Sequence, residues 1–147
     1  MTTNILATTS AVGSMLRAFR AHIYGRVLPA PVSLTFSADV REIGVQPEGG
    51  ADLVQHLGNV LLWAFTLSDV TAQWWRTTED RLHVSVHGRT TSGARMKVYG
   101  GGAFSDCRGL VPLALDESEG VSIDELYTLQ GLLREGHRDG QHEREVA

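Results

Sequence analysis

The run Arg81-Leu82-His83-Val84-Ser85-Val86-His87-Gly88-Arg89 alternates between polar and apolar residues, and Ala94-Arg95-Met96-Lys97-Val98-Tyr99 repeats the alternation. Strict alternation is typical of a strand that buries one face and leaves the other in water. The link between the two runs, Thr90-Thr91-Ser92-Gly93, is short and ends in glycine, as a hairpin loop should. The sequence therefore predicts a central β-hairpin with one apolar face and one basic, histidine-containing face.

The polar face of this hairpin carries the candidate binding residues. They are the basic, histidine and tyrosine side chains Arg81, His83, His87, Arg89, Arg95, Lys97 and Tyr99. Trp74 and Trp75 belong to a preceding predicted strand, where adjacent residues face opposite ways, so one indole is expected in the core and the other on the polar face. Basic groups with aromatic rings between them can hold a phosphate backbone and stack bases. One alternative is a solvated sheet face, which antiparallel sheets often have. The same face could also bind an acidic protein or be covered by the acidic tail of the chain itself.

The flanking sequence predicts the rest of the fold. Apolar residues at helical spacing indicate helices over 10–24, 51–67 and 122–136, and alternation indicates strands over 32–36, 40–46 and 70–77. The order α-β-β-α-β-β-β-α favours the α+β class, with an antiparallel sheet of about five strands and helices packed on one face. We expect a flexible N-terminus over 1–8, a single domain over 9–135 and a charged mobile tail over 136–147.

The helix predicted over 51–67 is apolar on most of its sides. Leu62, Trp63 and Phe65 widen a stripe that already faces inward. A helix of this kind is buried on more than one side, either within the monomer or against a second copy of the chain. Burial within the monomer is favoured here. The last helix has a capping box in Ser122 and Glu125 at its start, and Gly136 is expected to end it.

Composition restricts the classes of partner. The 147 residues suit one domain, and the net charge of −4 is unevenly spread, with a net +3 over 76–99 and a net −6 over 116–147. Cys107 is the only cysteine, and no secretion signal is recognisable, so we expect a reducing, cytoplasmic location. The longest apolar run, 60–65, is too short to cross a bilayer, so no membrane partner is expected.

The sequence contains no recognisable motif for a metal site, a nucleophilic cysteine or a phosphate-binding loop. His83 and His87 lie ~13 Å apart on a strand, too far to share a zinc ion, and we expect neither a metal nor a cofactor. Cys107 has no local signature of a nucleophile. Gly100-Gly101-Gly102 has the composition of a phosphate-binding loop, but neither a lysine nor a helix start follows. We predict a structural role instead, in which the glycines end the last strand and let the chain leave the sheet edge or approach another backbone closely.

These observations favour a small non-enzymatic binding or regulatory protein that acts through protein–protein contacts and self-associates. Trp63, Trp74 and Trp75 are the aromatic residues expected to anchor an interface. One alternative is nucleic-acid binding through the hairpin face, for which the acidic net charge is unfavourable. The other is a small enzyme or ligand-binding protein with a pocket between the sheet and residues 107–115.

Overall fold

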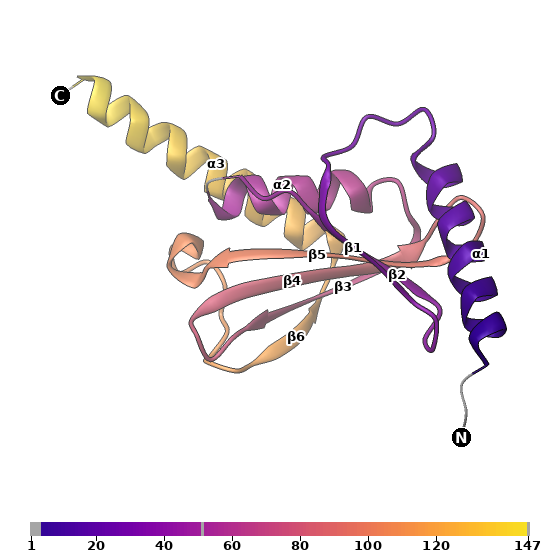
Figure 1. Cartoon of the computed structure of the whole chain (residues 1–147). Helices are drawn as coiled ribbons and strands as arrows, with labels where there is room; N and C mark the ends of the chain where they lie inside the picture. The colour runs from indigo at the N-terminus through magenta and orange to yellow at the C-terminus, as the bar shows by residue number, and fades with distance from the viewer. Residues whose placement is uncertain (1–3, 51, 147) are drawn as a thin grey trace.

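The computed structural model describes the backbone of residues 4–50 and 52–146, and side chains as far as Gly136. Within these residues, a six-stranded sheet carries three α-helices on one side (Figure 1). The elements follow in the order α1 (Ile5–Ile23), β1 (Pro31–Ser37), β2 (Glu42–Pro47), α2 (Leu53–Ala64), β3 (Ser68–Arg76), β4 (Arg81–Arg89), β5 (Arg95–Ala103), the 3₁₀ helix η1 (Phe104–Cys107), β6 (Ser118–Val121) and α3 (Ile123–Val146). The predicted α+β class is confirmed.

The strands lie in the order β1-β2-β5-β4-β3-β6. The predicted meander of β3, β4 and β5 is confirmed, and every pair is antiparallel except β2 with β5. Two features differ from the prediction. The acidic segment before α3 forms the edge strand β6, because its pairing with β3 buries Val121 against the core. The parallel pairing of β2 with β5 extends only from Glu42 to Val45, after which the chain turns away to enter α2.

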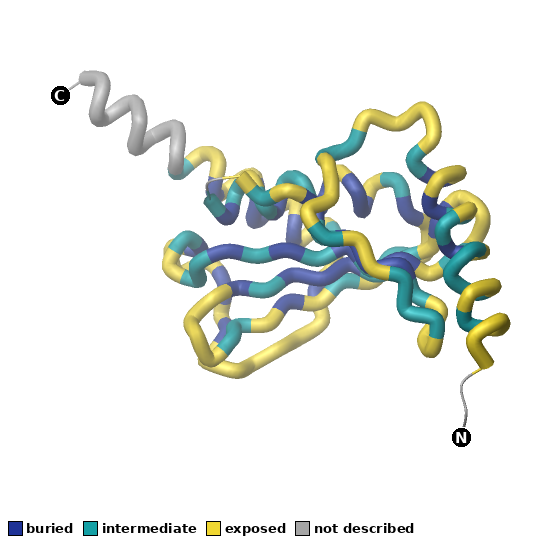
Figure 2. The backbone as a smooth tube through the Cα atoms, in the orientation of Figure 1, coloured by how far each residue is buried: buried dark blue, intermediate teal, exposed yellow. Residues whose placement is uncertain are grey.

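The inward face of the hairpin packs beneath α2 (Figure 2). Its buried side chains alternate as predicted: Leu82, Val84, Val86, Met96 and Val98. Gly100 and Gly102 continue this face, where a Cβ atom would lie 3.0 Å from Val60 Cγ2 and 3.1 Å from Leu53 Cβ, respectively. These two glycines therefore let α2 lie close to the sheet. Their predicted structural role is confirmed, although β5 runs through them to Ala103 instead of ending before them.

The surroundings of α2 settle which of its apolar residues are buried in the monomer. Trp63 is only 1% exposed, stacks on Phe19 at 6.2 Å and donates from Nε1 to the Pro29 carbonyl oxygen at 2.9 Å. Leu62 and Phe65 remain 55% and 82% exposed. Burial within the monomer thus explains Trp63, as predicted, and leaves the other two side chains in water.

The limits of α1 and α3 differ from those predicted. Helix α1 begins at Ile5, before the predicted Ser10, because the Asn4 side chain caps it by accepting from two backbone N–H groups. The capping box of α3 is confirmed, but the helix continues beyond Gly136 to Val146, a stretch that includes the good helix formers Arg, Gln and Glu. The predicted flexibility of residues 1–3 and 147 concerns positions outside the described residues. No helix in the described part of the chain is long and apolar enough to span a membrane.

Two segments bury less than their sequence pattern predicts. Val32 in β1 is 66% exposed, because β1 is an edge strand and its pairing with β2 is irregular between Pro31 and Ser33. In the irregular segment after β5, the apolar residues Val111 and Leu113 are buried, whereas Leu110 and Leu115 are exposed. Alternation or apolarity alone does not say whether another element lies above a residue.

A buried histidine in α1 contacts the segment after α2 and the loop between β4 and β5. His22 at the end of α1 is fully buried, and its Nδ1 accepts the Thr91 backbone N–H at 3.1 Å. Its Nε2 lies 2.7 Å from Thr66 Oγ1, just after α2. Because Nδ1 is an acceptor, the neutral ring carries its proton on Nε2. Burial, helped by the Arg26 guanidinium, lowers the pKa of His22 below its usual 6.5.

Acid is therefore expected to destabilise the fold through His22. Because the pKa of His22 is lower in the folded than in the unfolded chain, the unfolded chain binds more protons once the pH falls below about 6.5. The free energy of unfolding should decrease from there downward, as urea unfolding at a series of pH values would measure. His83, whose pKa is lowered too, acts in the same direction. The variant His22→Gln should show a shallower pH dependence, and a dependence equal to the wild type would contradict this assignment.

Candidate functional site

The candidate binding residues lie on the face of the sheet opposite the helices, here called the open face. Strand pairing and alternation place all of them there except Trp74: Trp75, Arg81, His83, His87, Arg89, Arg95, Lys97 and Tyr99. Trp74 faces the helix side, is buried and donates from Nε1 to Glu119 Oε1 at 2.8 Å. The prediction that the two indoles face opposite ways is confirmed, and Trp74 is removed from the candidate surface.

Three aromatic rings form a row across the centre of the open face. Trp75 on β3 pairs directly with His83 on β4, and their ring centroids are 6.3 Å apart. Tyr99 on β5 lies diagonally beyond, with its centroid 5.9 Å from that of His83. Lys97 places its Nζ atom 5.4 Å from the centroid of Tyr99. We call Trp75, His83 and Tyr99 the aromatic row; only the alternation in the sequence indicated that they share a face.

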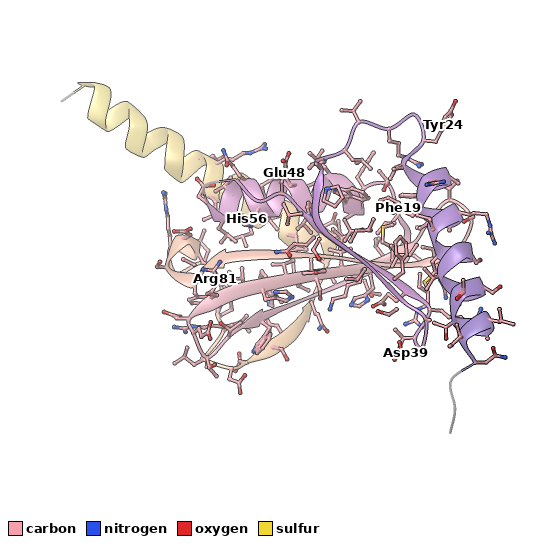
Figure 3. All side chains as sticks on the ribbon, viewed as in Figure 1. Phe19, Tyr24, Asp39, Glu48, His56 and Arg81 are labelled. Atoms are coloured by element: carbon pink, nitrogen blue, oxygen red, sulfur yellow. The ribbon has the colours of Figure 1, made fainter. Side chains whose placement is uncertain are left out.

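A cleft of about 370 Å³ opens beside the aromatic row. Its floor includes Gly101, which lies opposite His83 and has no side chain to fill the space. Its remaining walls come from three places in the chain: Gln46 at the end of β2, His56 on α2, and the turn and strand residues Thr77, Thr78, Glu79 and Arg81. Figure 3 shows His56 and Arg81 at the same end of the molecule. The cleft exists because β2 leaves β5 after Val45, which exposes that edge of β5.

The electrostatics of the cleft are mixed. Burial, and then the Lys97 ammonium, lower the pKa of His83 below 6.5, so its ring is neutral at neutral pH. Arg81 supplies a cation to the lining and Glu79 supplies an anion. Trp75 donates from Nε1 to Asp116 Oδ1 at 3.2 Å, which fixes the indole at the rim. The cleft therefore presents ring faces and hydrogen-bonding groups more than a concentrated positive charge.

The other end of the open face is a separate cluster. Glu42 Oε2 lies 3.4 Å from His87 Nδ1 and 3.8 Å from an Arg95 nitrogen. Arg89 donates to the carbonyl oxygen of Gly93 within its own hairpin loop. Three of the predicted basic or histidine side chains are thus engaged by the protein itself. The structure gathers Arg81 and the aromatic row around the cleft and leaves these three outside it.

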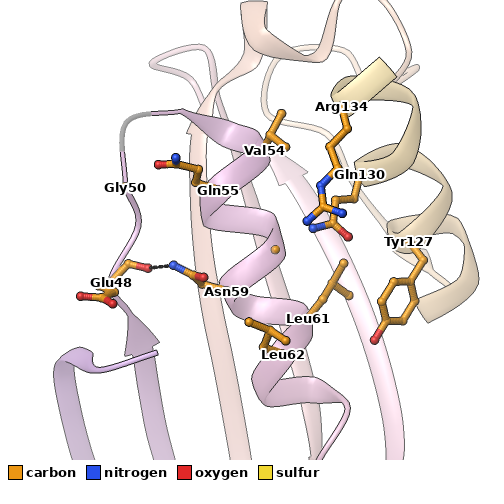
Figure 4. Close-up of a pocket in the computed structure, with 11 residues that line it drawn as sticks. Glu48, Gly50, Val54, Gln55, Asn59, Leu61, Leu62, Tyr127, Gln130 and Arg134 are labelled. Atoms are coloured by element: carbon orange, nitrogen blue, oxygen red, sulfur yellow. Dashed lines mark hydrogen bonds between the residues drawn. The ribbon is translucent and has the colours of Figure 1, made fainter. Parts of the chain in front are cut away.

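A groove of about 690 Å³ lies on the opposite side of the molecule, between α2, α3 and the chain before α2 (Figure 4). Its lining comprises Glu48, Gly50, Val54, Gln55, Gly58, Asn59, Leu61, Leu62, Tyr127, Gln130 and Arg134. Gly58 leaves room for the Gln130 side chain of α3, because a Cβ there would lie 2.7 Å from Gln130 Nε2. Leu62 and Tyr127 present exposed apolar surface, while Glu48 and Arg134 carry opposite charges on its two sides.

Cys107 does not suit nucleophilic chemistry. Its side chain is fully buried, and burial followed by the neighbouring Asp106 carboxylate raises the pKa of the thiol to about 11. A reactive cysteine needs an accessible thiolate, and this thiol stays protonated at neutral pH. The residue is part of the core beside β4 and β5.

The chain matches none of the protein-family models, curated proteins or solved structures with which it was compared. The two candidate binding surfaces are the cleft on the open face and the groove between α2 and α3.

Proposed function

We propose that this protein is a non-enzymatic binding protein that self-associates, with two copies packed through the outer side of α2. The observation that carries this is the side of α2 that borders the groove and ends in the exposed residues Leu62 and Phe65. Val54, Gly58, Leu62 and Phe65 recur at helical spacing along it. Fully burying a phenylalanine or leucine side chain stabilises by roughly 1.5–3 kcal/mol, so Leu62 and Phe65 leave favourable free energy for an association.

A second copy of the chain fits this surface because the surface is complementary to itself. Phe65 follows Leu62 by three residues and is 82% exposed, and Val54 and Gly58 line the groove nearer the start of α2, which is the hollow offered to a second copy. In a two-fold antiparallel arrangement, Phe65 of each copy enters the hollow of the other, as an isologous interface requires. The side-chain charges on the groove lining, Glu48 and Arg134, cancel, so two copies meet without net repulsion from them.

The aromatic anchors of this interface differ from those the sequence suggested. Trp63 and Trp74 are buried within the monomer, and Trp75 lies on the open face on the other side of the sheet. Phe65 and Tyr127 are the exposed aromatic side chains near the groove. Aromatic residues that lose their water on association commonly supply most of the binding energy of an interface.

Phe65→Glu is expected to convert the dimer to a monomer. The substitution removes the protruding ring and places a charge where an apolar hollow of the partner would have to cover it. Sedimentation velocity and light scattering, over a concentration series, should give a mass twice the 16.0 kDa of the chain for the wild type and close to 16.0 kDa for the variant.

Val40→Glu is the matched control. Val40 is also an exposed apolar residue, and it lies in the turn between β1 and β2, far from the groove, beside the labelled Asp39 in Figure 3. This variant should remain dimeric. A wild-type protein that is monomeric at every concentration would overturn the proposal, as would a Phe65→Glu variant with the mass of the wild type.

A further inference from the structure

The open face has a feature that self-association through α2 leaves unused. The aromatic row crosses β3, β4 and β5, and each ring comes from a different strand. Trp75 is 39% exposed, and His83 and Tyr99 are partly exposed. Beside the row, the absent side chain of Gly101 leaves bare backbone on the floor of the cleft. A flat ligand can lie on such a surface, against ring faces and backbone together.

We propose that the cleft and the aromatic row bind single-stranded nucleic acid, with unpaired bases stacked on Trp75 and Tyr99 and the phosphate backbone held by Lys97 and Arg81. Stacking on aromatic side chains is the chief sequence-tolerant source of affinity for single strands, because every base has a π face. Open antiparallel sheets with aromatic residues on adjacent strands present such faces to successive bases. The site is separate from the groove on α2, so both can be occupied at once.

The shape of the site favours single strands over duplexes. Bases in a duplex are stacked on one another and cannot lie flat on rings that line a cleft, whereas unpaired bases can be splayed out onto them. A volume of about 370 Å³ is enough for bases to enter and far too small for a double helix. Gln46, Thr77 and Thr78 in the lining offer hydrogen-bond donors and acceptors for base edges.

The charges favour nucleic acid over an acidic protein as the ligand. Arg81 and Glu79 line the cleft, while Lys97 lies beside the ring of Tyr99 and Asp116 accepts from Trp75. A surface that binds an acidic protein by charge needs many unpaired cations, but Arg95 and His87 already face Glu42. The site offers more aromatic surface than unpaired positive charge, and the neutral ring of His83 is part of that surface. Affinity should therefore come mainly from stacking, with a small electrostatic component.

Fluorescence anisotropy of labelled single-stranded RNA and DNA of about 12 nucleotides, titrated with the full chain, tests this inference. Binding is expected to one or both, with a matched duplex binding much more weakly. The variants Trp75→Leu and Tyr99→Leu should each weaken binding about tenfold or more, because each removes a stacking surface. Tyr24→Leu is the matched control, since Tyr24 is an exposed tyrosine at the C-terminal end of α1, outside the cleft, and it should bind like the wild type.

The salt dependence of the affinity for oligonucleotides shows whether a particular cation contacts a phosphate group. Lys97→Gln should reduce the slope of log affinity against log salt by about one, and Arg20→Gln, which removes an exposed cation on α1, should not. Phe65→Glu should bind as the wild type does, so failure of the dimer proposal and failure of this one are distinguishable. Equal binding of the duplex, loss of affinity in the Tyr24 control, or no binding at low salt would overturn the inference. Displacement by polyglutamate that does not depend on Trp75 would instead identify a surface for acidic proteins.

Discussion

Trp63→Ala is expected to lower the free energy of unfolding by about 3–5 kcal/mol, the usual cost of removing a large aromatic side chain from a core. Trp63 joins elements that lie far apart in the sequence. Its ring stacks on Phe19 of α1, and its Nε1 atom donates to the carbonyl oxygen of Pro29 before β1. The substitution therefore leaves a cavity between α1 and α2 and an unpaired carbonyl group. Urea unfolding followed by far-UV circular dichroism measures the change.

Two further variants show which part of the indole matters. Trp63→Phe keeps a ring against Phe19 but removes the donor to Pro29, so it should cost less, on the order of 1 kcal/mol for the hydrogen bond plus part of the packing. Trp75→Ala makes the same truncation on the open face, at a partly exposed residue, and should be far milder than Trp63→Ala. Similar losses in Trp63→Ala and Trp75→Ala would contradict the placement of Trp63 at the centre of the core.

The parts of the fold that the sequence predicts correctly depend on local signals. The alternation of β4 and β5 assigns each side chain to a face without reference to other elements, and the same argument separates Trp74 from Trp75. The capping box at Ser122 is complete within four residues and is seen in the structure. Signals of this kind depend only on neighbours in the chain, so they can be interpreted before any packing is known.

The parts that the sequence does not predict depend on where distant elements meet. The parallel pairing of β2 with β5 ends at Val45, and only that divergence brings Gln46 and His56 to the cleft. The sequence around His56 contains no signal for a site. The apolar surface of α2 extends around most of the helix, and the positions of α1 and Pro29 decide that Trp63 is covered while Phe65 is left exposed. Similarly, β6 becomes a strand because the edge of β3 is available to pair with it.

Gly101→Ala is expected to destabilise the protein by about 1–3 kcal/mol or more, the range found when atoms are forced into a packed site. A Cβ atom at this position would lie 2.1 Å from the carbonyl oxygen of Leu82 and 3.3 Å from the Cα atom of His83. Both neighbours are backbone atoms of β4, so no rotamer change relieves the contact, and the two central strands have to separate. Urea unfolding compared with the wild type gives the size of the loss.

Gly120→Ala is the matched control, because Gly120 also lies in a strand but has no atom within 4 Å of its would-be Cβ. There the added methyl group should be neutral or slightly stabilising, by up to about 1 kcal/mol, since alanine loses less backbone entropy on folding than glycine. If Gly101→Ala behaved like Gly120→Ala, β4 and β5 could not lie as close at Gly101 as they do here. The same close approach keeps the floor of the cleft bare beside His83, so a Gly101→Ala protein that still folds should also bind single-stranded oligonucleotides more weakly.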